Sequence, residues 1–244
     1  MHRPGHPAHS APFLARHPSN RLPPERLATL ALAPVCLTGL FYAFAGELPH
    51  SLAILLLPQA LAFCGLAIWA RQNHAVTERL GLSIIQLRQG LRWGIPTGLA
   101  LGVLNVSIIL WVVPGLGGDI EFLRSTPHAL APPPLMLPWM IIAIAFAIEL
   151  NFRGFLLGRF LALSQQAIVP GSPKLGMALA IGLSSVAFAF DPFMVVTFKH
   201  LHWIALWDGI VWGTIWLRLR NLYAPISAHA VEVIVMYSVM KLIL

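Results

Sequence analysis

Seven long stretches of this chain are mostly apolar and nearly free of charge, and they constrain its fold more than any other feature. They lie at about residues 27–46, 51–70, 93–113, 134–157, 175–191, 201–217 and 222–240. Most approach the roughly 20 residues that a helix needs to cross about 30 Å of hydrocarbon. The pattern predicts an all-α polytopic integral membrane bundle of about seven transmembrane helices. Six spans plus a re-entrant segment near residues 191–202 is the alternative.

Charge supports the membrane class and suggests an orientation. Charged residues make up 10% of the sequence, against about a quarter in a soluble domain. Arginine and lysine collect in the N-terminal tail and in the second, fourth and sixth connections, while the odd-numbered connections are poorer in them. Basic residues favour the cytoplasmic side, so the N-terminus is expected in the cytoplasm and the C-terminus outside. The net charge of +7 is spread over membrane flanks, so no nucleic-acid partner is expected.

The sequence divides into two regions. Residues 1–26 are rich in Pro, His and Arg and lack a hydrophobic period, which predicts a disordered cytoplasmic tail. Residues 27–244 form the predicted membrane domain. Within it, Gly98 and Gly102, and again Gly209 and Gly213, have the four-residue spacing that lets helices approach closely, and contacts inside the bundle are favoured for both pairs.

Ionisable side chains are expensive inside a bilayer, and those expected at membrane depth are therefore candidates for function. They are Glu149, Arg153, Asp191, Asp208, His229 and Glu232. Glu149 and Arg153 are four residues apart and share one helical face, as do His229 and Glu232, which are three apart. Such a set suits a metal site, a proton or substrate path, or a buried network that only holds helices together.

Two segments that contain these ionisable residues resemble the CPBP family of intramembrane proteases. This family includes the CAAX prenyl endopeptidases and the bacteriocin-processing and immunity proteins. The first segment, residues 148–157, carries Glu149-(x)3-Arg153-Gly. The second, residues 208–232, contains a glycine pair, a short basic turn and Ala-Pro-(x)3-His229 in family order. The resemblance covers a core of about residues 80–240 and implies a CAAX-protease-like helical fold.

The family motifs are carried over only in part. Glu149 matches the second glutamate of the first motif, Arg153 its arginine, and His229 the histidine of the third motif.

Three other motif positions differ from the family. Ile148 stands at the first glutamate, Pro192 at the second-motif histidine and Val233 at the third-motif asparagine. Neither Ile nor Pro can take a proton from water. Polar residues lie beside each gap, which makes Asp191 and Glu232 auxiliary candidates.

The resemblance implies an endopeptidase that acts on a peptide or lipidated protein substrate within the bilayer, in a bacterial inner membrane. Glu149 would activate water, and Arg153 would orient Glu149. His229 would bind the developing oxyanion or, together with Glu149, a divalent metal, with zinc foremost. The losses at Ile148 and Pro192 favour an alternative, a non-catalytic immunity, binding or scaffolding relative. A small transporter with an acidic relay is a second alternative. Oligomeric state stays open.

Overall fold

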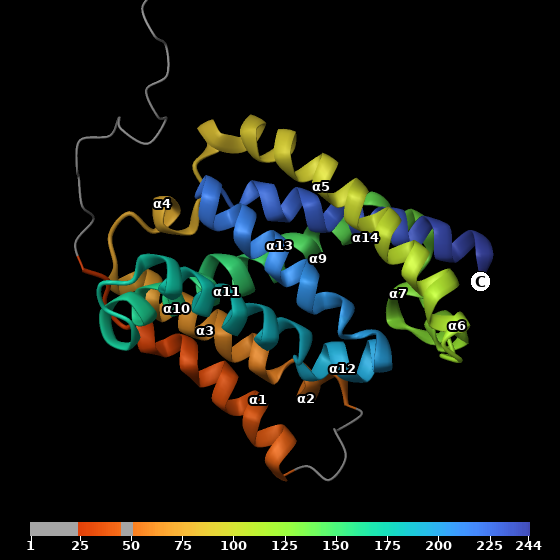
Figure 1. The fold of residues 1–244 in the computed structure, drawn as a ribbon, viewed down its shortest axis with the longest axis horizontal. Coiled ribbons are helices and arrows are strands. Elements are labelled where there is room, and N and C mark those ends of the chain that lie inside the picture. Colours follow the sequence, from red (N-terminus) through yellow and green to blue (C-terminus); the bar gives the residue numbers. More distant parts are fainter. Residues whose placement is uncertain (1–23, 45–50) are drawn as a thin grey trace, which may run out of the picture.

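The computed structural model describes residues 24–44 and 51–244, so the predicted disordered tail lies outside the described residues up to residue 23. The described residues form helices and short connections and contain no strand, which confirms the all-α prediction. Figure 1 shows an elongated bundle in which most helices run along the long axis.

Fourteen α-helical segments occur in the described part of the chain: α1 (Leu32–Phe44), α2 (Leu52–Leu55), α3 (Leu57–Gln72), α4 (Val76–Leu80), α5 (Leu87–Ser107), α6 (Val113–Gly115), α7 (Pro127–Leu130), α8 (Pro133–Leu135), α9 (Ile141–Glu149), α10 (Gly158–Leu163), α11 (Pro173–Ala189), α12 (Pro192–Phe198), α13 (Ile204–Leu219) and α14 (Tyr223–Ile243). Short 3-10 turns join them: η1 (Ala28–Ala31), η2 (Ile84–Gln86), η4 (Glu121–Ser125) and η8 (Lys199–Leu201). Wider π-helical turns continue several helices: η3 (Ile108–Val112), η5 (Met136–Met140), η6 (Leu150–Leu157) and η7 (Ser164–Ile168).

Within the described residues each of the seven predicted stretches consists largely of helix, but fewer are long enough to cross a membrane alone. Val76–Gly115, Pro133–Ile168 and Tyr223–Ile243 are long and apolar enough. A fourth span is formed only if Pro173–Ala189 and Pro192–Leu201, bent by 52°, count as one broken or re-entrant unit. The described residues thus support three or four spans by length and composition, fewer than seven. The helices α3 and α13 have 16 residues each, and at about 1.5 Å per residue each is shorter than the hydrocarbon core.

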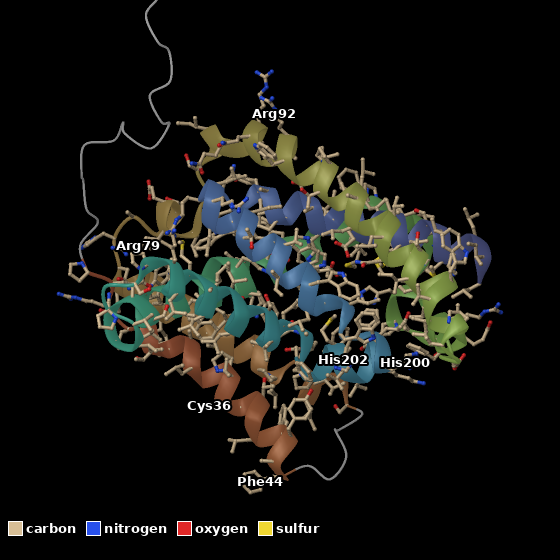
Figure 2. All side chains as sticks on the ribbon, viewed as in Figure 1. Cys36, Phe44, Arg79, Arg92, His200 and His202 are labelled. Carbon is tan, nitrogen blue, oxygen red and sulfur yellow. The ribbon has the colours of Figure 1, made fainter. Side chains whose placement is uncertain are left out.

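The connections predicted to face the cytoplasm gather at one end of the bundle. In Figure 1 the start of the described chain, α4, α10 and the turn between α13 and α14 lie at the left, and α6, α7 and α12 lie at the right. Hydrogen bonds join the segments of the left end: Leu222 N–H donates to Gly81 O (2.8 Å), and Asn73 Nδ2 donates to Arg26 O (3.0 Å). Figure 2 labels Arg79 at this end and His200 and His202 at the other.

A row of glycines brings α5 and α14 together. A Cβ atom added to Gly94 would lie 1.8 Å from Ser227 Oγ, and one added to Gly98 would lie 2.3 Å from Ala228 O. At Gly102 the nearest atom is Val235 Cβ, at 2.9 Å. Only glycine permits this approach, so the prediction that Gly98 and Gly102 serve contacts inside the bundle is confirmed.

In the second glycine pair only Gly209 permits such a close approach, because a Cβ added at Gly213 would make an ordinary van der Waals contact. An added Cβ at Gly209 would meet Ser185 Cβ of α11 at 2.9 Å, and at Gly213 it would meet Leu157 Cδ2 at 3.5 Å. The main hydrophobic core lies where α11 and α13 pack against η6, which forms the centre of the long helix Pro133–Ile168.

Candidate active site

The long helix Pro133–Ile168 carries Glu149 and Arg153, and at these residues it changes from α-helical to π-helical winding. Glu149 is the last residue of α9, and the following π-helical turns η6 carry Arg153. All of residues 151–157 are buried, so this segment presents no face to lipid or water. Ser184 Oγ of α11 donates to Phe152 O (2.8 Å), which satisfies a carbonyl in the π-helical segment.

Glu149, Arg153 and His229 form one hydrogen-bonded unit. Arg153 Nη1 donates to Glu149 Oε1 at 3.1 Å, and His229 Nδ1 lies 2.8 Å from the same oxygen. The Glu149 and Arg153 side chains are 0% exposed, and His229 is 6% exposed. A charge pair buried this completely is kept only where close partners compensate the lost hydration. Glu149 Oε2 has no hydrogen-bond partner among the described residues.

Two aromatic rings enclose the cation and the imidazole. The Arg153 guanidinium lies over Phe188 at 4.6 Å and over Trp212 at 4.9 Å. His229 stacks on Trp212 with ring centres 4.4 Å apart and planes at 16°. Cation–π contacts of this kind gain strength when water is excluded. The Nε1 donor of Trp212 is buried and has no hydrogen-bond partner among the described residues.

A second polar cluster adjoins this unit. Asn105 Nδ2 of α5 donates to Glu232 Oε1 at 2.8 Å and to both Asp208 oxygens at 3.2 Å. Trp207 Nε1 donates to Asn105 Oδ1 at 3.0 Å, which fixes the orientation of the amide. The carboxyls of Asp208 and Glu232 interact with each other and with the Arg153 charge. Carboxyl groups from three helices thus act on the Arg153 charge.

The predicted site residues are therefore brought together unevenly. The three catalytic candidates meet, and Glu232 lies in the adjoining cluster. Asp191 lies elsewhere: its Oδ1 accepts from Phe193 N–H and from Gln59 Nε2, both at 3.0 Å. It is the N-cap of α12, because the bend after α11 leaves the first amides of α12 without helical partners.

Sequence reasoning missed the residues that support the charged groups. Three polar residues that carry no charge were not singled out from the sequence: Asn105, Trp207 and Trp212. Amides and indoles are not ionisable, so a search for charged groups at membrane depth does not find them. A usable signal was present for Asn105, since an amide in the middle of an apolar span needs a polar partner.

The predicted metal site does not fit the donors. Within residues 24–44 and 51–244, no three or more His, Cys, Asp or Glu side chains are arranged to hold a metal ion. The two predicted ligands, Glu149 and His229, bond to each other, and Arg153 competes for the same carboxylate oxygen.

Comparison with known proteins gives one match. Residues 130–235 match the sequence model of the family described as type II CAAX prenyl endopeptidase Rce1-like. This segment contains Glu149, Arg153, Asp208, His229 and Glu232. The match confirms the resemblance to the CPBP and CAAX protease family, and together with the apolar helices it supports an integral membrane protein. No curated protein and no solved structure matches the chain.

Proposed function

We propose that this protein is an intramembrane endopeptidase that cleaves a peptide or lipidated protein substrate. The observation that carries the proposal is the buried Glu149 carboxylate, held by Arg153 and His229 within the segment that matches the prenyl endopeptidase family. Peptide hydrolysis needs a base for water and a donor for the oxyanion, and these residues supply groups of both kinds.

In the proposed reaction Glu149 takes a proton from water through Oε2, whose lone pairs have no other partner. The resulting hydroxide attacks the scissile carbonyl carbon, and the carbonyl oxygen becomes an oxyanion. The Trp212 N–H, which has no other partner among the described residues, and His229 would serve as donors to this oxyanion. Glu149 then returns its proton to the leaving amine as the C–N bond breaks, which balances the step. Arg153 holds Glu149 through Oε1 and leaves Oε2 for chemistry.

The test is cleavage of a farnesylated peptide by purified protein in detergent, followed by mass spectrometry of the products. Glu149→Gln keeps the size and one acceptor oxygen but cannot take the proton, so cleavage should fall at least about 100-fold. Glu121→Gln, which changes an exposed glutamate paired with Arg124, is the matched control and should cleave normally. Equal cleavage by both variants would refute the role of Glu149.

One observation favours a second function, that of a non-catalytic immunity, binding or scaffolding protein. Glu149 is 0% exposed, and Ile148 and Pro192 occupy motif positions of the family's glutamate and histidine. A site closed in this way holds helices together without admitting substrate. On this alternative the wild-type protein cleaves no prenylated peptide, and Glu149→Gln lowers only the thermal unfolding midpoint.

A further inference from the structure

A cavity lies at the end of the bundle where the basic connections gather. It has a volume of about 360 Å³ and is bounded by α4, α10, the end of α13 and the first described residues. That volume is in the range of small-ligand sites. Its lining includes six charged or amide side chains: Glu25, Glu78, Arg79, Arg159, Gln165 and Arg220. None of these residues belongs to the proposed active site.

Arg159 is the most deeply placed cation of this cavity. It is 2% exposed, and its guanidinium lies over the Trp69 ring at 3.8 Å and forms an ion pair with Glu25. Its Nη1 is buried and has no hydrogen-bond partner among the described residues. An unmet donor on a buried charge costs free energy, so a ligand that accepts from it is favoured.

One carboxylate of the chain itself, that of Glu25, already lies in the cavity. Glu25 Oε1 accepts from Trp69 Nε1 at 2.6 Å, and Glu25 Oε2 lies 3.7 Å from Arg79 Nη1. Glu25 thus occupies part of the cationic wall.

Two further charged residues, Arg220 and Glu78, also line the cavity. Arg220 lies over the Trp216 ring at 5.4 Å, and Glu78 is exposed and accepts from Thr77 Oγ1. Three arginines against two glutamates leave the lining with an excess of one positive charge.

We propose that this cavity binds a phosphate group, with Arg159 and Arg220 as its cationic contacts and Gln165 as a neutral donor. Guanidinium groups match phosphate oxygens in geometry as well as in charge. Basic cavities between helices at a membrane flank are suited to anionic lipid headgroups, and a free phosphate presents the same oxygens. The proposal does not depend on peptidase activity.

The experiment measures the thermal unfolding midpoint of the full chain in a neutral detergent. Phosphatidylglycerol and phosphatidylcholine are titrated as mixed micelles, and inorganic phosphate is titrated against chloride at matched ionic strength. We expect a saturable rise with phosphatidylglycerol and none with phosphatidylcholine. A saturable rise with inorganic phosphate as well would identify a soluble phosphate as a sufficient ligand, and a rise with phosphatidylglycerol alone would identify a lipid headgroup. Phosphatidylcholine carries a phosphate whose charge is neutralised by its choline group, so the same rise with both lipids would show that the arginines select no anionic phosphate and would overturn the proposal.

Three variants locate the site. Arg220→Gln should weaken binding about tenfold, the effect of losing one charge-assisted contact. Arg218→Gln is the matched control, because Arg218 is exposed two residues away and does not line the cavity. Glu25→Gln should tighten binding several-fold by removing the competing carboxylate. Equal losses in Arg218→Gln and Arg220→Gln, or weaker binding in Glu25→Gln, would show only general surface attraction and overturn the site.

Discussion

At the scale of single residues, the site is defined by how a few buried polar groups find partners. Arg153 uses Nη1 for Glu149 and presents its remaining surface to Phe188 and Trp212. His229 comes from a helix 80 residues later in the chain and reaches the same carboxylate. The Glu149–Arg153 pair follows from local helical spacing, so the sequence predicted it. The His229 contact depends on tertiary packing.

The first residue-scale prediction concerns Trp212. Trp212→Phe keeps most of the ring that stacks on His229 but removes the unpartnered Nε1 donor. We expect kcat for the farnesylated peptide to fall by about 10-fold or more with KM little changed, as for loss of an oxyanion donor. Trp216→Phe is the comparison, because Trp216 Nε1 donates to Leu80 O, and its loss should lower stability instead of kcat. A normal kcat in Trp212→Phe would remove Trp212 from the mechanism.

His128 lies in α7, just before the long helix Pro133–Ile168, and its burial predicts a pH-dependent stability. Burial, chiefly, and the nearby His229 lower the pKa of His128 below its ordinary value of 6.5. The unfolded chain therefore binds this proton more readily, so stability is present above about pH 6.5 and is lost as the pH falls below it.

The matched substitution is His128→Phe, which keeps the stacking on Phe198 at 5.9 Å and removes the buried Nδ1 that has no partner among the described residues. The unfolding midpoint of the variant should fall less than that of the wild type between pH 8 and pH 5. His74→Phe, at an exposed histidine, should leave the wild-type pH dependence unchanged. Parallel curves for wild type and His128→Phe would contradict the assignment.

At the scale of elements, the approach of α5 to α14 sets the second polar cluster. The glycine row allows the two backbones to touch, and the same helix pair then places Asn105 beside Glu232. The four-residue glycine spacing was visible in the sequence. The helix that these glycines face could not be predicted from the sequence, because the spacing indicates only that some backbone comes close.

A substitution in that row tests the packing. Gly94→Ala would place a methyl group 1.8 Å from Ser227 Oγ and 2.4 Å from Ala224 O, so α5 must shift away from α14. We expect a loss of about 1–3 kcal/mol in the free energy of unfolding, the usual effect of overpacking. The control is Gly182→Ala on α11, where nothing lies within 4 Å and alanine favours the helix. Equal stability of both variants would mean that α5 and α14 are not in contact at Gly94.

At the scale of the whole molecule, the bundle separates two chemically different ends. The basic connections and the phosphate-site cavity lie at the end that contains Arg79, and His200 and His202 lie at the other (Figure 2). This separation agrees with the orientation expected from the sequence, in which the N-terminus is cytoplasmic and the C-terminus external.

Reporter fusions in bacteria check the orientation. Alkaline phosphatase fused after Leu244 should be active, because that enzyme folds only outside the cytoplasm, and a fluorescent protein fused before Met1 should be bright. Exchange of the two reporters should silence both. An inactive phosphatase on an otherwise stable fusion would reverse the proposed topology.

The sequence by itself determined the membrane class, the helical stretches and the shared face of Glu149 and Arg153. These follow from composition and from periods of three or four residues, which neighbouring residues encode. Tertiary structure decided that His229 meets Glu149, that Asp191 caps α12 instead of joining the site, and that three or four helical stretches of the described residues are long enough to span a membrane. Those outcomes depend on which helix faces pack against one another, and on where a chain bends to satisfy its free backbone amides.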